Sequence, residues 1–261
     1  MITAASNSRI KRLVQLNQKS KLRRTEDVFL AEGVKMFLEA PREQLQEVYV
    51  SEFFLEKCSC REHLEEVGYE VVSDSVFSKI SDTCTPQGVL CVLKQFHYNI
   101  EEMLRDKAPL FLLLENIQDP GNLGTMLRTG EGAGVSGIIM SRDTVDLYNP
   151  KVIRSTMGSI YRVPFYYADD FAAAVHQVQQ AGVSVYAAHL RGKNSYACQD
   201  YTKGTAFLIG NEGNGLREET AELADCYIRI PMEGKVESLN AAVASSILMY
   251  EAHRQRATIE K

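Results

Sequence analysis

The sequence contains no apolar run that approaches the length of a membrane span, for which about 20 residues are needed. Residues 1–14 include basic side chains and lack the apolar stretch typical of a signal peptide. Hydrophobic residues make up 45% and charged residues 24% of the 261 positions, a composition typical of soluble globular proteins. We therefore expect a cytoplasmic protein without membrane contact, long enough for one large core or two smaller ones.

Patterns that would indicate a metal centre or a disulfide framework are also missing. The six cysteines are scattered without a CxxC pair, and the five histidines show no spacing typical of a metal site. We expect no bound metal, which argues against a zinc hydrolase. We also expect the cysteines to be reduced thiols that lie mostly in the core.

Net positive charge is confined to the amino-terminal end. Residues 1–27 carry seven Lys or Arg against two acidic residues, whereas the whole chain carries −5, so the remaining residues carry −10. Apolar residues at helical spacing over 3–16 predict a basic amphipathic helix. We call this basic segment, residues 1–27, the arm. Its charge favours contact with a polyanion, because Lys and Arg displace counterions from phosphates. An ordinary solvated helix face is the alternative.

Alternating strand and helix patterns predict two α/β regions. The arm and the short elements between 28 and 93 form a small domain over residues 1–95, and the polar stretch 96–107 is typical of a linker. The second region covers 108–261. Its first strand, 110–114, is wholly apolar, as in a parallel sheet buried on both faces. Further strands are expected at 137–140, 163–166, 183–188, 206–209 and 227–230, with helices at 120–132, 151–158, 171–180, 216–223 and 238–256.

The segment after the 110–114 strand combines helix-start signals with glycines. Asp119 is suited to cap a helix and Pro120 to begin it. Gly121, Gly124 and Arg128 then share one helix face. Two glycines in a helix cost about 1 kcal/mol each relative to alanine, which indicates that another group approaches the backbone closely. Arg128 is placed to reach a phosphate or a partner, with an ordinary surface arginine as the alternative.

Two further strands run into glycine-bearing loops. Residues 210–215 read G-N-E-G-N-G, and open α/β sheets bind ligands at the carboxyl ends of their strands. A mobile turn is the alternative there. The 227–230 strand breaks into a Pro/Gly loop that ends at Ser238, which is suited to cap the following helix. A GxGxxG match at 132–137 follows a helix and precedes a strand, the reverse of the order that a dinucleotide site needs.

Together, these three segments resemble the signature motifs of the SpoU/TrmH branch of the SPOUT RNA methyltransferases. The first matches N-x-G-x-x-x-R-T, the second G-x-E-G-x-G-L and the third I-P-M-x-G-x-x-x-S-L-N, in the family's order. The resemblance covers residues 108–257. The amino-terminal region, with S-R-I-K at 8–11, F-L-A-E-G at 29–33 and T-P-Q-G-V at 85–89, is similar to the substrate-binding domain that larger members carry. That variant resembles ribosomal RNA ribose methyltransferases more than the shorter tRNA enzymes.

The resemblance implies a parallel-sheet SPOUT domain with a deep trefoil knot, preceded by a small α/β, ribosomal-protein-like RNA-binding domain. Ordinary topology rules would exclude such a knot. In the family the knot binds S-adenosylmethionine, and two protomers pair through it as a homodimer. Carried over by position, the cofactor contacts are Gly210, Ile230 and Leu239, and the catalytic and substrate-orienting residues are Asn122, Arg128, Glu212, Ser238 and Asn240.

The implied reaction transfers a methyl group to a ribose 2′-hydroxyl, with large-subunit ribosomal RNA as the expected substrate. A guanidinium is effectively always protonated, so we expect Arg128 to hold a phosphate rather than act as the base. The expected contacts with the RNA backbone are Arg9, Lys11, Arg12, Lys21, Arg23 and Arg24.

Three other functions remain as alternatives. A tRNA ribose methyltransferase is the nearest. A non-catalytic RNA-binding or ribosome-assembly protein is disfavoured because the motif residues are all present. A nucleotide-dependent oxidoreductase would need the misplaced GxGxxG segment.

Overall fold

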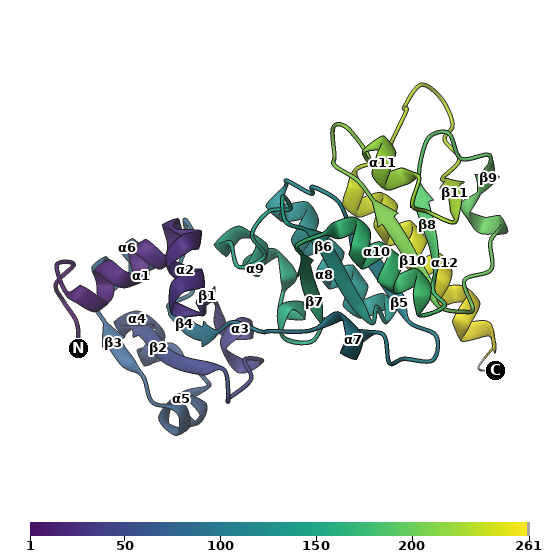
Figure 1. Cartoon of the computed structure of the whole chain (residues 1–261). Coiled ribbons are helices and arrows are strands. Elements are labelled where there is room, and N and C mark those ends of the chain that lie inside the picture. The colour runs from purple at the N-terminus through teal and green to yellow at the C-terminus, as the bar shows by residue number, and fades with distance from the viewer. Residues whose placement is uncertain (260–261) are drawn as a thin grey trace. The chain divides into compact units, whose positions relative to one another are not determined.

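The computed structural model describes residues 1–259 and divides the chain into two compact units (Figure 1). Unit 1 comprises Met1–Phe96 with Asp146–Tyr161, and unit 2 comprises His97–Val145 with Arg162–Lys261. The later segment of unit 1 lies within the sequence of the second expected region, which no sequence pattern indicated. Within residues 1–259, no helix is both long enough and apolar enough to cross a bilayer.

Unit 1 is a four-stranded sheet with helices packed against it. The strand order is β1-β4-β2-β3, with β4 antiparallel to β1 and β2, and β2 parallel to β3. The expected amphipathic helix is α1, which turns Ile10, Leu13 and Leu16 into the core of the unit. The elements are α1 (Ser8–Gln18), α2 (Ser20–Glu26), β1 (Val28–Glu32), α3 (Val34–Leu38), β2 (Leu45–Ser51), α4 (Glu52–Lys57), α5 (Arg61–Val67), β3 (Glu70–Val72), α6 (Asp74–Ile80), β4 (Val89–Lys94), α9 (Pro150–Thr156) and η1 (Ser159–Tyr161).

Unit 2 contains a seven-stranded sheet in the order β7-β6-β5-β10-β8-β11-β9, and every neighbouring pair is parallel. This confirms the expected α/β class with a parallel sheet. The elements are α7 (Ile100–Met103), β5 (Leu110–Leu114), α8 (Pro120–Ala133), β6 (Gly137–Ser141), β7 (Phe165–Ala168), α10 (Phe171–Gln180), β8 (Ser184–Ala188), β9 (Asn194–Ser195), η2 (Tyr196–Cys198), β10 (Thr205–Ile209), α11 (Glu218–Ala221), β11 (Cys226–Arg229) and α12 (Ala241–Ile259).

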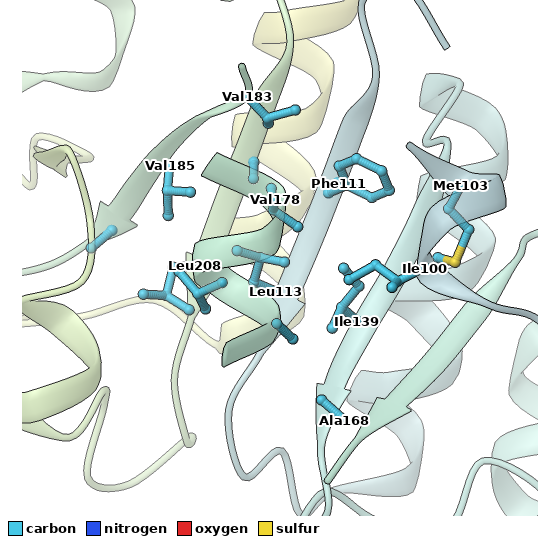
Figure 2. Close-up of a cluster of buried hydrophobic side chains, with 14 residues drawn as sticks. Ile100, Met103, Phe111, Leu113, Ile139, Ala168, Val178, Val183, Val185 and Leu208 are labelled. Carbon is cyan, nitrogen blue, oxygen red and sulfur yellow. The ribbon is translucent and has the colours of Figure 1, made fainter. Parts of the chain in front are cut away.

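Helices cover both faces of this sheet. Every residue of β5, β6 and β10 is buried, as expected for central parallel strands. On one face, α10 and α7 pack against alternate strand residues such as Phe111, Leu113 and Leu208 (Figure 2). On the other face, α12 packs against α8 and β10. The short helix α7 lies in the stretch expected to be a linker, and it buries Ile100 and Met103 in this core.

Two helix starts show where local sequence signals hold and where they fail. The side chain of Asp119 accepts a hydrogen bond from the Asn122 amide, and Pro120 opens α8, so both predictions are confirmed. The predicted cap of the last helix is wrong. Asn240, not Ser238, accepts hydrogen bonds from the amides of Ala242 and Val243, at 2.9 and 3.3 Å.

The cysteines also differ from expectation. All six are free thiols, but Cys91 is the one fully buried cysteine, and Cys84 and Cys198 are exposed. The expectation of mostly core thiols is therefore wrong. Among residues 1–259, no group of three or more His, Cys, Asp or Glu side chains is arranged to hold a metal ion.

Candidate active site

The predicted cofactor residues meet at one edge of the parallel sheet of unit 2. The strands β8, β10 and β11 are neighbours, and their carboxyl ends open into a cavity of about 330 Å³. Gly210, Ile230 and Leu239 all line it, as do Glu212 and Ser238. A smaller cavity of about 230 Å³ in unit 1, beside Arg42 and Gly68, holds none of the predicted residues.

Sequence analysis did not predict that residues at the end of β8 line the cavity. Ala188, His189 and Leu190 line the cavity together with the two glycine-bearing loops. The three strand ends share an edge because β8 pairs in parallel with both β10 and β11. The rule that ligands bind at carboxyl ends of parallel strands would have indicated β8 as well, had the strand order been known.

The loop after β10 is closed so tightly that its first residue must be glycine. A Cβ atom on Gly210 would lie 2.2 Å from the backbone C of Gly215 and the N of Leu216. Asn211 and Gly215 exchange two backbone hydrogen bonds of 3.0 and 2.9 Å, and Gly215 has a positive φ of 70°. The loop is therefore closed by its own backbone contacts and hydrogen bonds, at a spacing that only glycine allows at position 210.

A chain of side-chain hydrogen bonds joins the three motifs. The Nδ2 group of Asn240 donates to Oδ1 of Asn122 at 2.9 Å. The Nδ2 group of Asn122 donates in turn to Oε1 of Glu212 at 2.9 Å. The structure thus brings together three of the five predicted catalytic residues, from the start of α8, the loop after β10 and the start of α12.

Glu212 is held as a carboxylate at the amino terminus of α8. Its Oε1 and Oε2 atoms accept the backbone N–H groups of Asp119 and Gln118 at 3.0 and 3.1 Å. Burial alone would raise the pKa of Glu212, but the hydrogen bonds from Asn122 and these amides outweigh it and lower the pKa. The lowered pKa favours the carboxylate form, which accepts the hydrogen bonds that tie this loop to the start of α8.

A buried carboxylate, on Glu115, fixes the far end of the same loop. This side chain is 2% exposed and accepts hydrogen bonds from the backbone amide of Arg217, at 2.8 Å, and the hydroxyl of Thr220. The guanidinium of Arg217 pairs with Asp143. Sequence analysis assigned no role to Glu115, because its burial could not be read from the sequence.

Comparison with known proteins identifies the family of this chain. Residues 109–250 match the model of the SpoU rRNA Methylase family, and residues 7–91 match an MRM3-like substrate binding domain. The chain belongs to the SpoU rRNA methylase family. It is 32% identical over 252 residues to the 23S rRNA (guanosine(2553)-2'-O)-methyltransferase RlmP of Bacillus subtilis (strain 168), covering 95% of this chain and 97% of the relative.

Solved structures with bound cofactor share the whole fold of this SpoU methylase. An AdoMet-bound rRNA methyltransferase from Sinorhizobium meliloti has a TM-score of 0.83 at 31% identity, covering 97% of both chains. The SpoU methyltransferase AviRb from Streptomyces viridochromogenes, in complex with AdoMet, has a TM-score of 0.87 at 26% identity, covering 97% of this chain and 99% of that one.

The cavity of this SpoU methylase suits S-adenosylmethionine. Its volume of about 330 Å³ is within the range of small-molecule sites. Residues of both loops line it, among them Gly210, Gly213 and Gly215 of the loop after β10. Of its charged side chains, Glu212 and Glu237 are acidic and Arg229 is basic. This mixture, with an acidic excess, is compatible with a cationic sulfonium.

Arg128 and Ser238 do not join the hydrogen-bonded chain of the other three residues. Arg128 is exposed on α8, and Ser238 is exposed on the loop that precedes α12. Within residues 1–259, neither side chain has a hydrogen-bonding or ionic partner. Both are therefore available to a bound molecule.

The predicted RNA contacts in unit 1 fall into two groups. Lys11, Lys21 and Arg24 are exposed. The three others are engaged: Arg9 pairs with Glu70, Arg12 with Glu26 and Glu47, and Arg23 with Asp146.

Arg23 lies in the interior of unit 1. It is 3% exposed, and its guanidinium donates to the carbonyl of Leu16 at 2.6 Å as well as to Asp146. The sequence pattern could not separate this buried arginine from its exposed neighbour Arg24, because both lie in one basic run. Arg23 is therefore not available for contact at the surface of unit 1.

Proposed function

We propose that this SpoU methylase transfers the methyl group of S-adenosylmethionine to a ribose 2′-hydroxyl of large-subunit ribosomal RNA. The observation that carries this proposal is the cavity at the ends of β8, β10 and β11, beside which Asn122, Glu212 and Asn240 lock the three motifs together. Membership of the family and relatives named 23S rRNA 2′-O-methyltransferases favour ribosomal RNA over tRNA.

Gly210, Ile230 and Leu239 hold the cofactor mainly through backbone groups of the two loops. When bound, S-adenosylmethionine supplies an electrophilic methyl group on a sulfonium. The chain's own task is to orient the ribose hydroxyl in line with that methyl group and to exclude water. The Asn240–Asn122–Glu212 chain keeps the loops in place while this happens.

Arg128 holds a phosphate of the RNA next to the reacting ribose. Its guanidinium stays protonated, so the proton of the hydroxyl leaves to a phosphate oxygen or to water. Replacing Arg128 by Lys keeps the charge and removes the planar fork that binds a phosphate through two donors. We expect Arg128→Lys to lower kcat/KM for RNA by roughly tenfold or more, with S-adenosylmethionine affinity retained in calorimetry. Full turnover by the variant would overturn this role.

The wider organisation is also part of the proposal. Residues 1–95 bind RNA, 96–107 connect the domains and 108–261 form the knotted methyltransferase domain of a cytoplasmic enzyme. Two protomers pair through α8 and α12. On α12, the apolar side chains of Val243 and Tyr250 are 48% and 49% exposed. Exposed apolar side chains beside Arg128's helix support this pairing.

Methyl transfer to purified RNA tests the main proposal. Ribosomal RNA from a strain that lacks the gene has the acceptor ribose free, so we expect radiolabelled methyl groups to enter it. Ribosomal RNA from the parent strain is the matched control and should accept none, because its site is already methylated. Incorporation into tRNA instead of ribosomal RNA would support the tRNA alternative. Absence of cofactor binding would support a non-catalytic RNA-binding protein.

A further inference from the structure

His189 lies in the wall of the cavity, at the end of β8, and no motif includes it. Its backbone amide donates to the carbonyl of Ile228 on the neighbouring strand β11 at 3.0 Å. Its ring packs against Tyr227, with the ring centroids 5.0 Å apart. Figure 1 shows β8 and β11 side by side in the sheet. The imidazole is therefore fixed between two strand ends that border the cavity.

The imidazole also closes the turn that follows β8. The backbone amide of Arg191 donates to Nδ1 of His189 at 3.1 Å, and the amide of Gly192 donates to the His189 carbonyl at 2.9 Å. An Nδ1 atom that accepts a hydrogen bond carries no proton, so the neutral ring has its proton on Nε2. Protonation of Nδ1 would break the bond to Arg191.

This turn has little room to move. A Cβ atom on Gly192 would lie 2.7 Å from the backbone C of Ile228, so the turn is pressed against the end of β11. The residue after Ile228 and Arg229 is Ile230, one of the predicted cofactor contacts. Opening the turn would therefore disturb the strand end from which the third motif begins.

Burial and a neighbouring positive charge favour the neutral form of the imidazole. Burial lowers the pKa of His189, the positive charge of Arg191 lowers it further, and Glu218 opposes these effects only in part. Arg191 itself is paired with Glu218 on α11. Tyr227 faces the ring from β11. The charged side chains that line the cavity are Glu212, Glu237 and Arg229. A protonated His189 would add a positive charge to a wall that otherwise has an acidic excess.

We infer that His189 is a positioning and selectivity residue of the cofactor cavity. Its neutral imidazole holds the turn against β11 and keeps the wall free of an added positive charge, so that the cavity accepts a cationic sulfonium. The inference rests on the proposed function, because it concerns the same cavity. Its consequence is specific: acid weakens the binding of S-adenosylmethionine more than that of S-adenosylhomocysteine, whose sulfur is neutral.

Calorimetry on the full chain with both compounds, at pH 7.0 and 5.0, tests this inference. A group that must lose a proton before a ligand binds weakens binding by about tenfold for each pH unit below its pKa. From pH 7.0 to 5.0 we expect the affinity for S-adenosylmethionine to fall roughly fivefold more than that for S-adenosylhomocysteine. Far-UV circular dichroism at both pH values reports whether the chain stays folded.

Two matched variants identify the group responsible. In His189→Asn the amide oxygen takes the place of Nδ1 as acceptor for Arg191 and cannot gain a proton, so the ratio of the two affinities should no longer depend on pH. His176→Asn, on α10 and outside the cavity, should keep the wild-type dependence. A wild-type ratio that is constant between the two pH values, or a His189→Asn ratio that still changes, would overturn the inference. Failure of both compounds to bind at pH 7.0 would instead overturn the proposed function.

Discussion

At the scale of single residues, the site depends on close backbone approach and on carboxylates that accept several hydrogen bonds. Gly210 sits against Gly215 and Leu216 with no space for a side chain. Glu212 and Glu115 hold the two ends of the same loop to the start of α8 and to the end of β5. Both carboxylates therefore hold the geometry of this loop.

Two glycines of one loop provide a matched test of this geometry. A Cβ atom on Gly210 would meet backbone atoms at 2.2 Å, whereas one on Gly213 would meet nothing closer than 3.6 Å. We expect Gly210→Ala to destabilise the protein by about 3 kcal/mol or more, because overpacked backbone must shift. Gly213→Ala should change stability by less than about 1 kcal/mol. Urea unfolding measures both, and equal effects would contradict the close approach at Gly210.

At the scale of secondary structure, strand and helix positions in unit 2 follow the sequence closely. The expected strands correspond to β5, β6, β7, β8, β10 and β11. The central strands β5, β6 and β10 are fully buried, and such parallel strands are near-continuous apolar runs in the sequence. The start of α12 was misplaced. Ser and Asn cap helices about equally well, so the sequence alone could not decide between Ser238 and Asn240. The tertiary bond from Asn240 to Asn122 favours the later residue.

Replacement of Asn240 separates its cap from its contact with Asn122. Asn240→Ala should cost about 1–2 kcal/mol of stability, because two amides of α12 lose their acceptor. Asn240→Asp retains an acceptor for those amides and loses the donor to Asn122, so it should recover most of the stability and still bind S-adenosylmethionine more weakly than wild type. Thermal unfolding and calorimetry measure the two effects. A larger stability loss from Ser238→Ala than from Asn240→Ala would contradict this assignment.

At the scale of the whole molecule, charge and fold are distributed unequally over the chain. The basic residues 1–27 belong to unit 1, and the acidic remainder includes the cofactor cavity of unit 2. The arm cannot be removed as a simple tail, since Ile10, Leu13 and Leu16 are part of the core of unit 1. Its contribution to RNA binding must be tested with side-chain changes that leave this core intact.

The exposed cations Lys11, Lys21 and Arg24 provide that test. Replacing all three by Gln should weaken RNA binding and reduce the slope of log affinity against log salt by about 0.7–0.9 for each lost phosphate contact. Cofactor affinity should stay at the wild-type value. The control variant replaces Lys57 and Lys79 by Gln, because both are exposed lysines elsewhere in unit 1. Filter binding over a salt series measures the slopes; equal slopes for both variants would contradict an RNA surface on the arm.

The sequence by itself determined the α/β class, the parallel sheet and the three motif segments, because these depend on local periodicity, caps and glycine spacing. It also indicated Gly210, Ile230 and Leu239, which line one cavity. Only the tertiary structure decided that Arg23 is buried, that Asn240 caps α12 and that His189 borders the cavity. The burial of Arg23, the contact of Asn240 with Asn122 and the place of His189 beside β11 depend on residues far apart in the chain, whereas the cap bonds themselves are local. Spacing along a single sequence carries no information about which distant residues meet.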